Sequence, residues 1–262
     1  MNRFLIKRYF SYFIKSRHRK GFGIHSPFVY DFVANLLNER YEYYDYQRIH
    51  SWKKAMSRNK IIIDVTSFGA GSSVTESKKR KIGKIISSGS ISKRFGELLF
   101  RMVDFFSPAG ILELGTSFGI STLYLSLPKR SAKIVTIEGC KKTAEWAYEA
   151  FNEFEIKNIE LLVGKFSELI PEAIKILPSL DFVFFDGDHR KESTLSYFNE
   201  CLKFVHNDSI FVFDDIHWSQ GMEDAWIEIV ANPKVTISID IFRFGIVFFK
   251  KECQKEHFVV RF

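Results

Sequence analysis

From residue 111 onward, short apolar runs alternate with longer amphipathic stretches of helical length. The first five runs are continuously apolar, which is typical of strands that are covered on both faces. This pattern predicts a parallel sheet with helices on each side. The last two runs are separated by only four residues and predict an antiparallel hairpin at the sheet edge. The seven runs are 111–114, 134–137, 159–163, 182–185, 210–213, 235–241 and 246–249.

The part of the chain before residue 95 has a different character. Its patterns predict a basic amphipathic helix over 1–15, a helix over 27–40 that starts at Ser26-Pro27, and a helix over 94–106. A short strand is expected at 61–65, and a flexible loop at 67–73. We therefore expect a basic, mainly helical extension over 1–94. Residues 95–262 should form a doubly wound, Rossmann-like α/β domain with a seven-stranded, mostly parallel sheet.

The charge of the chain is concentrated near its beginning. The formal net charge is +7, and residues 1–20 hold seven basic residues and no acid. Residues 1–94 carry +14 and residues 95–262 carry −7. There is no apolar run of membrane-spanning length and no continuous apolar stretch typical of a signal peptide. The three cysteines have no paired spacing, so we expect reduced thiols and a cytoplasmic protein.

Three interpretations of the basic first helix remain open. It could dock its aromatic face on the rest of the chain, lie on an anionic membrane surface through residues 1–20, or bind nucleic acid. Nucleic acid is disfavoured, because no known binding module is present and the negative charge of residues 95–262 would repel phosphate.

Two carboxylates lie at the ends of the first two predicted strands. Glu113 stands two residues before Gly115 in a Gly-x-x-x-Gly turn, which matches neither a P-loop nor a dinucleotide fingerprint. A carboxylate there would repel a pyrophosphate but suits a cationic ligand. Glu138 ends the second strand, where an acid can accept both hydroxyls of a ribose. The alternatives are a helix-capping role for Glu113 and a surface position for Glu138.

These residues resemble the first two motifs of the class I S-adenosylmethionine-dependent methyltransferases, and the resemblance covers about residues 95–250. It implies that Gly115 and Gly119 lie under the methionine and ribose and that Glu138 holds the ribose hydroxyls. Adenine contacts would follow the third strand, where Lys165 departs from the usual Asp, so backbone atoms or Phe166 are expected instead. The full cofactor set implied is Glu113, Gly115, Thr116, Ser117, Gly119, Glu138, Gly164, Lys165, Phe166 and Asp186.

Aspartates follow the fourth and fifth predicted strands. Asp186 follows one, and Asp214 and Asp215 follow the other. Carboxylates that converge at neighbouring strand ends need a shared proton or a hard cation such as Mg²⁺ or Mn²⁺. The pattern is similar to the metal-dependent O-methyltransferases of the catechol, caffeoyl-CoA and macrolide-sugar types. That resemblance implies a metal on Asp186, Asp214 and Asp215 that binds the substrate hydroxyl; hydrogen bonds to loop amides are the metal-free alternative.

Two histidines compete as the general base. His189 stands three positions after Asp186, where catechol-type relatives carry a basic residue. His217 follows Asp215 by two positions. An imidazole suits either role because it accepts a proton near neutral pH. Capping of the next helix is the structural alternative for His189.

The sequence thus predicts an S-adenosylmethionine-dependent O-methyltransferase that acts on a small or lipid-linked hydroxyl compound. The Pro-containing motifs of nucleobase methylation are absent, which disfavours methylation of bases. The alternatives are a membrane-peripheral binding protein on a methyltransferase fold and an RNA methyltransferase. By the resemblance, helices ahead of the first motif would help form the substrate pocket and the contacts of a homodimer.

Overall fold

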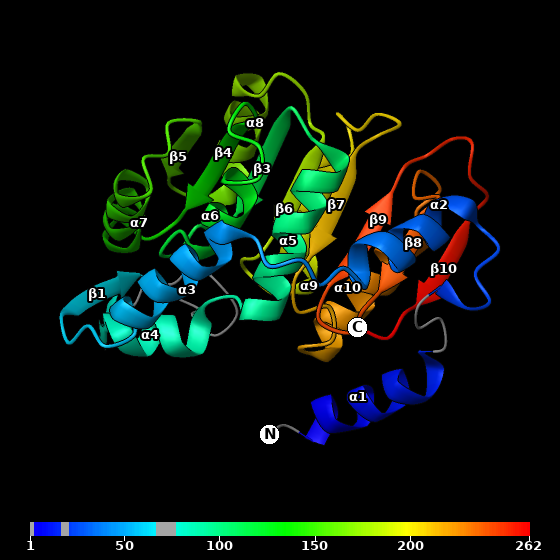
Figure 1. The fold of residues 1–262 in the computed structure, drawn as a ribbon, viewed down its shortest axis with the longest axis horizontal. Helices are drawn as coiled ribbons and strands as arrows, with labels where there is room; N and C mark the ends of the chain where they lie inside the picture. The colour runs from blue at the N-terminus through cyan, green and yellow to red at the C-terminus, as the bar shows by residue number, and fades with distance from the viewer. Residues whose placement is uncertain (1–2, 17–20, 67–76) are drawn as a thin grey trace. The chain divides into compact units, whose positions relative to one another are not determined.

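The structure is a computed structural model that describes residues 3–16, 21–66 and 77–262 (Figure 1). The predicted loop at 67–73 lies outside the described residues. The chain divides into two compact units, which are taken separately below. The central unit comprises residues 40–179, and the terminal unit comprises residues 1–39 together with 180–262. The predicted domain boundary at residue 94 stays a prediction.

Three parallel strands form the centre of the central unit (Figure 1). They are β3 (Gly110–Leu114), β4 (Lys133–Glu138) and β5 (Ile159–Val163), with β4 in the middle. Helix α6 (Ile120–Ser126) follows β3, α7 (Lys141–Glu153) packs on β4 and β5, and α8 (Phe166–Ile176) packs on β3 and β4. This strand–helix alternation confirms the predicted parallel α/β pattern, and it brings the ends of β3, β4 and β5 to one edge.

The remaining elements of the central unit precede β3. Helix α3 (Tyr44–Met56) packs on α4 (Ile82–Gly89), and β1 (Ile62–Thr66) pairs antiparallel with β2 (Ser77–Lys81). Helix α5 (Lys93–Phe106) lies against α6. Their contact needs a glycine, because a Cβ at Gly96 would stand 2.2 Å from the Tyr124 ring. The predicted strand at 61–65 and helix at 94–106 are confirmed.

The terminal unit holds five strands in the order β10-β8-β9-β7-β6. They are β6 (Phe182–Phe185), β7 (Ile210–Phe213), β8 (Ile237–Asp240), β9 (Gly245–Phe248) and β10 (Glu256–Val259). β6 and β7 are parallel, whereas β9 runs antiparallel to both β7 and β8. Helices α9 (Lys191–Cys201) and α10 (Gln220–Ala231) pack on each other. The predicted antiparallel hairpin of the last two runs is therefore confirmed as β8 and β9, but its predicted place at the sheet edge is wrong, because β10 pairs with the outer side of β8.

The number of strands differs from the prediction. The strands from β3 to β10 number eight rather than seven, because β10 pairs parallel with β8. The segment Glu256–Val259 begins with two exposed polar residues, and Phe258 is its one buried residue. It therefore lacks the continuous apolar run by which the other strands were recognised.

The first helix, α1 (Arg3–Lys15), packs on the terminal unit through one face. The buried Tyr12 hydroxyl donates to the carbonyl of Val260 at 2.6 Å, and Arg8 pairs with Glu223. Helix α2 (Pro27–Asp31) starts where Ser26 caps Val29, as predicted, and continues as the π-helical turn η2 (Phe32–Leu37). No helix in the described ranges is long and apolar enough to cross a membrane.

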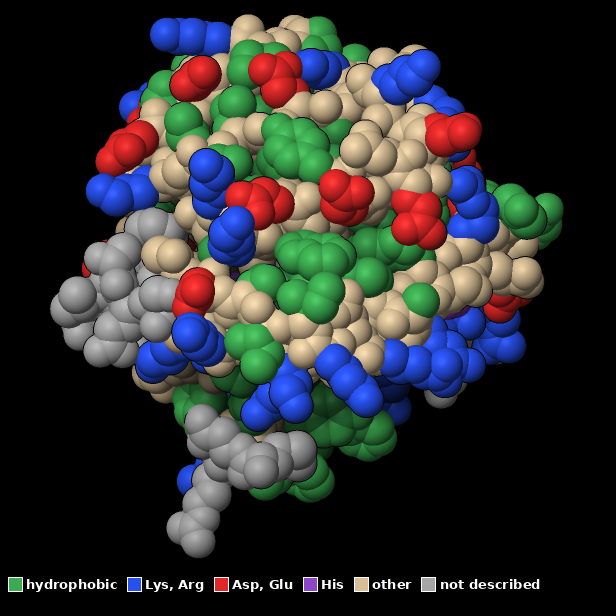
Figure 2. Space-filling model, turned by 90° about the vertical axis from the view of Figure 1, so that its left-hand side faces the viewer, with side chains coloured by type: hydrophobic (Ala, Val, Ile, Leu, Met, Phe, Trp, Pro, Cys, Tyr) green, Lys and Arg blue, Asp and Glu red, His purple; other side chains and the backbone are tan. Residues whose placement is uncertain are grey.

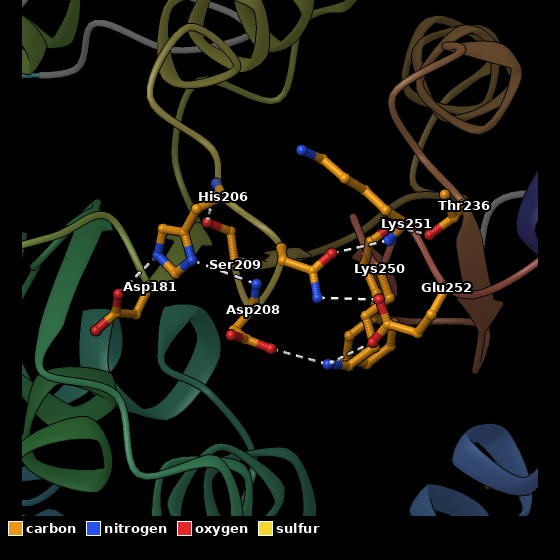
Figure 3. A network of polar contacts seen from close by, with 10 residues as sticks. Asp181, His206, Asp208, Ser209, Thr236, Lys250, Lys251 and Glu252 are labelled. Atoms are coloured by element: carbon orange, nitrogen blue, oxygen red, sulfur yellow. Dashed lines mark hydrogen bonds and ion pairs between the residues drawn. The ribbon is translucent and has the colours of Figure 1, made fainter.

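A polar network joins the loops at the amino ends of β6 and β7 (Figure 3). Asp181 precedes β6 and accepts from His206, while Asp208 pairs with Lys250 beyond the end of the antiparallel β9. Ser209 donates to the carbonyl of Leu180. These contacts lie at the edge opposite to the carboxyl ends of β6 and β7, so this polar network stabilises the sheet and is separate from the site residues.

Candidate active site

Glu113 lies fully buried in β3 of the central unit. Its Oε2 accepts hydrogen bonds from the hydroxyls of Thr122 and Thr136, the latter at 2.6 Å. Thr136 uses its single proton in this bond, so Thr116, which lies 2.6 Å from the Thr136 hydroxyl, must donate to it. The predicted cofactor residue Thr116 therefore supports Glu113 through Thr136.

The other oxygen of Glu113, Oε1, has no hydrogen-bond partner among the described residues. Burial raises the pKa of Glu113, and the hydroxyls of Ser121, Thr122 and Thr136 act against that rise. A buried carboxylate oxygen without a partner is costly, since its desolvation is uncompensated. A cationic or proton-donating ligand would remove that cost, and this fits the predicted cationic group.

Glu138 ends β4 and holds the turn that follows β3. Its Oε2 accepts from the amide of Ser117 at 2.7 Å, and its Oε1 accepts from the amide of Cys140 at 2.8 Å. Burial raises the pKa of Glu138, and these amide bonds oppose the rise. Glu138 is not fully buried, so hydroxyls of a ligand can reach its carboxylate oxygens, which accept more than one hydrogen bond each. The residues present thus fit a ribose.

The turn between β3 and α6 has a backbone that few side chains tolerate. Gly119 has a φ of +78°, and a Cβ there would stand 2.7 Å from the ring of Phe151. Ser117 also adopts a positive φ of +48°, which is rare for a residue with a side chain. Such strain is typical of functional sites, and here the amide of Ser117 is the donor that reaches Glu138. Gly115 precedes it with a φ of +111°.

The residues after β5 lie at the same edge of the parallel strands. The amide of Gly164 donates to the carbonyl of Glu138 at 2.9 Å, which fixes the segment beside the end of β4. Lys165 is exposed and pairs with Glu168 at 3.2 Å. Phe166 begins α8 and is half-buried. The described contacts of Lys165 are on the surface.

In the terminal unit, the structure brings the three predicted aspartates together. We call Asp186, Asp214 and Asp215 the acid cluster. Asp186 follows β6, and Asp214 and Asp215 follow the parallel β7. Burial, followed by the negative charge of Asp214, raises the pKa of Asp186 well above its ordinary range. The same causes raise the pKa of Asp215 to about 6.

A fourth residue, Arg243, joins the acid cluster from the turn between β8 and β9. Its Nε and Nη2 donate to the two carboxylate oxygens of Asp214, each at 2.7 Å. Its Nε also lies 3.7 Å from Oδ1 of Asp215. Asp214 is 1% exposed, so this bidentate pair is largely removed from water. The sequence did not point to Arg243, because no motif links it to an aspartate 29 positions earlier.

The two candidate bases have different surroundings within the terminal unit. His189 Nε2 lies 3.8 Å from Oδ1 of Asp186, and its loop is held by Asp188, which accepts from Arg190 and Tyr197. His217 instead pairs with Asp240, at 2.9 Å from its Nε2. Nδ1 of His217 is buried and without a partner in the described part of the chain. His189 is therefore the histidine placed beside the acid cluster.

A comparison with known protein families now adds to this geometry. Residues 112–216 match the methyltransferase domain family. The match starts in β3, one residue before Glu113, and ends one residue after Asp215. It confirms the resemblance to methyltransferases that the two acidic motifs predicted.

Individual relatives are O-methyltransferases by name. A transmembrane O-methyltransferase homolog of Rattus norvegicus is 38% identical over 80 residues, which make up 29% of this chain and 31% of the relative. A catechol O-methyltransferase of Niastella koreensis is 26% identical over 131 residues, which make up 48% of this chain and 58% of the relative. The chain thus matches less than two thirds of the length of these curated relatives.

Solved structures share the fold. An O-methyltransferase from Bacillus cereus, in complex with S-adenosylhomocysteine, matches with a TM-score of 0.57 and 18% identity. The match covers 85% of this chain and 97% of that protein. At this identity the likeness concerns the fold, and it confirms the Rossmann-like methyltransferase architecture.

Proposed function

We propose that this protein is an S-adenosylmethionine-dependent O-methyltransferase that acts on the hydroxyl group of a small or lipid-linked substrate. The observation that carries the proposal is the buried Glu113 oxygen without a partner, which lies in β3, where the methyltransferase match begins. The names of the relatives support oxygen as the acceptor atom. The free cysteines agree with a location in the cytoplasm, which is part of this proposal.

The central unit would bind the cofactor. When bound, S-adenosylmethionine supplies an electrophilic methyl group on a sulfonium. Glu113 would face the positive charge of the methionine part through Oε1, and Glu138 would accept the ribose hydroxyls. Gly115 and Gly119 keep the turn open, since side chains there would strain the backbone.

The terminal unit would handle the acceptor. His189 is the favoured base, because its Nε2 can take the proton of the acceptor hydroxyl and lies beside the acid cluster, 3.8 Å from Oδ1 of Asp186. His217 is the second candidate, since Asp240 holds its Nε2 and leaves Nδ1 as an acceptor. Positioning of the acceptor oxygen by such groups is a large part of what an enzyme contributes to a displacement.

A divalent metal ion does not fit the acid cluster as it stands. Arg243 occupies both oxygens of Asp214, and no group of His, Cys, Asp or Glu in the described ranges has the arrangement of a metal site. Assistance by Mg²⁺ or Mn²⁺ stays a prediction, and the chemistry proposed above does not depend on it.

Calorimetry with S-adenosylmethionine tests the proposed function. The intact protein should bind it, and Gly115→Arg or Glu138→Ala should abolish the heat of binding. Glu145→Ala is the matched control, because Glu145 is an exposed acid on α7 that pairs with Lys142. Absence of binding heat with the intact protein would refute the cofactor proposal.

A second candidate function rests on the outer face of α1. Ile6, Phe10 and Ile14 form a line along this helix and are 45%, 66% and 59% exposed. Lys7 and Lys15 are exposed beside them. The opposite face is the one held by Tyr12 and Arg8. An exposed apolar face flanked by lysines is typical of helices that lie on membrane surfaces.

We infer that α1 contacts an anionic membrane surface. Residues 1–20 carry seven basic residues and no acid, so anionic lipid headgroups complement this end of the chain. Two copies of the chain pairing through α1 would instead bring like charges together. Figure 2 shows one face of the molecule, on which basic and acidic side chains are interspersed above a mostly basic lower edge.

Co-sedimentation with vesicles tests the membrane contact. The full chain should sediment with vesicles that contain anionic lipid and stay in solution with neutral ones, and Phe10→Ser with Ile14→Ser should weaken this binding at least about tenfold. Tyr41→Ser with Tyr44→Ser is the control, since both tyrosines are exposed but lie outside α1. Equal binding by both double variants would contradict the inference. A dimer that the α1 variant dissociates would assign the face to a second copy.

A further inference from the structure

Arg243 is held in the acid cluster by more than its side chain. The turn that carries it has a positive φ of +72° at Phe242, and the loop after β7 has a positive φ of +54° at Asp215. The amide of Ile216 donates to the carbonyl of Arg243 at 3.3 Å, which joins the two loops through the backbone. The guanidinium is thus positioned by the fold rather than by a chance surface contact.

The charges of the acid cluster show what Arg243 does there. Three carboxyl groups lie together, because Asp186 follows β6 and Asp214 and Asp215 follow the parallel β7. One guanidinium pairs with Asp214 and stands beside Asp215, so a fixed positive charge already lies where the negative charges converge. An arginine stays protonated at every physiological pH, and its planar fork matches a carboxylate.

A divalent ion would compete with this arrangement. It would need oxygen atoms that Arg243 now occupies, and it would stand within a few ångströms of a permanent positive charge. Ligation by Asp214 would therefore disturb a buried bidentate pair and place the ion beside the guanidinium.

We propose that Arg243 takes the place of the divalent metal ion in this site, as a positioning residue that holds Asp214 and Asp215 and makes the acid cluster independent of metal. This inference builds on the proposed function, because it concerns the cluster assigned to the acceptor. It predicts methyl transfer that neither chelators suppress nor Mg²⁺ stimulates.

Binding of Mn²⁺ alone tests the proposal without knowledge of the acceptor. Electron paramagnetic resonance measures the free Mn²⁺ that remains in the presence of the full chain. The intact protein should leave the signal of free Mn²⁺ unchanged. Arg243→Ala should bind Mn²⁺ at least about tenfold more tightly, because it exposes the carboxylates and removes the opposing charge. Arg243→Lys keeps the charge and should resemble the intact protein.

The control variant is Lys203→Ala, which removes an exposed cation from a surface pair with Glu200. It should not change Mn²⁺ binding. Stoichiometric binding of Mn²⁺ by the intact protein that Asp214→Asn abolishes would overturn the proposal, and so would an Arg243→Ala variant that folds but gains no Mn²⁺ affinity. Near-UV circular dichroism reports whether each variant folds. If Arg243→Ala does not fold, Mn²⁺ binding by the intact protein and by Arg243→Lys still tests the proposal. Calorimetry with S-adenosylmethionine on the same samples reports separately whether the proposed function fails.

Discussion

The carboxylate of Glu113 has no exposed surface, so only protein groups or a ligand can stabilise its charged form. Thr122 and Thr136 serve one oxygen, and the other has no partner in the described chain. The side chain that would bind the cofactor therefore lowers the stability of the folded protein when no ligand is bound. This agrees with the general tendency of functional sites to be less stable than the rest of a fold.

The first prediction concerns Glu113→Gln and its dependence on pH. Burial raises the folded-state pKa of Glu113 above its ordinary value of 4.5, so the folded protein holds this proton more tightly than the unfolded chain. Its contribution to stability is fully present below pH 4.5 and is lost as the pH rises through the folded-state pKa. Glu113→Gln should remove this loss and stabilise the empty protein at pH 8 by about 1 kcal/mol or more, with little effect at pH 4.

Urea denaturation at both pH values measures this difference. Glu145→Gln serves as the control, since Glu145 is exposed on α7. If Glu113→Gln raised the free energy of unfolding equally at pH 8 and at pH 4, the charge of Glu113 would not be the source of the stabilisation.

At the scale of elements, tight turns place the site residues. Gly119 lies where β3 passes into α6, with Phe151 of α7 packed against it. The same turn carries Ser117, whose amide reaches Glu138 at the end of β4. One turn thus joins the carboxylates of two strands, and its distortion would affect both.

The second prediction is that Gly119→Ala destabilises the protein by about 1–3 kcal/mol, because a positive φ and a close contact act together. A Cβ would approach Phe151 to 2.7 Å and Ala147 to 3.4 Å. Affinity for S-adenosylhomocysteine should fall as well. Denaturation and calorimetry measure the two effects, with Gly89→Ala as the control, because a Cβ at Gly89 would meet nothing within 4 Å. Similar losses in both variants would contradict the packing argument.

The third prediction concerns the pair that joins the loop after β7 to the turn between β8 and β9. Asp214→Ala should lower the free energy of unfolding by about 3–5 kcal/mol, because it leaves the partly buried Arg243 without its carboxylate. Glu200→Ala removes an exposed partner of Lys203 and should cost less than about 1 kcal/mol. Urea denaturation compares the two, and equal costs would show that Arg243 finds another partner when Asp214 is lost.

At the scale of the whole molecule, the sequence predicts what depends on continuous patterns. Strands β3 to β9 follow from apolar runs, and the convergence of Asp186, Asp214 and Asp215 follows from their positions after parallel strands. Arg243 could not be predicted, because its direction depends on the backbone of a turn and on pairing between distant segments. The hydrogen bond from Thr136 to Glu113 could not be predicted either. It depends on the β3–β4 register, which places the two residues opposite each other and cannot be derived from the sequence of either strand alone.

The fourth prediction separates the cofactor from the metal in one measurement on the intact protein. A ligand that binds only the folded state at about 100 times its Kd adds about 2.7 kcal/mol of stability. S-adenosylhomocysteine should therefore raise the Tm by about 5–10 °C for a chain of this size. Mg²⁺ should leave the Tm unchanged, because the guanidinium of Arg243 already offsets negative charge in the acid cluster. Gly115→Arg should remove the shift with S-adenosylhomocysteine. An unchanged Tm with S-adenosylhomocysteine would contradict the proposed function. A rise of the Tm with Mg²⁺ that Asp214→Asn removes would contradict the role proposed for Arg243.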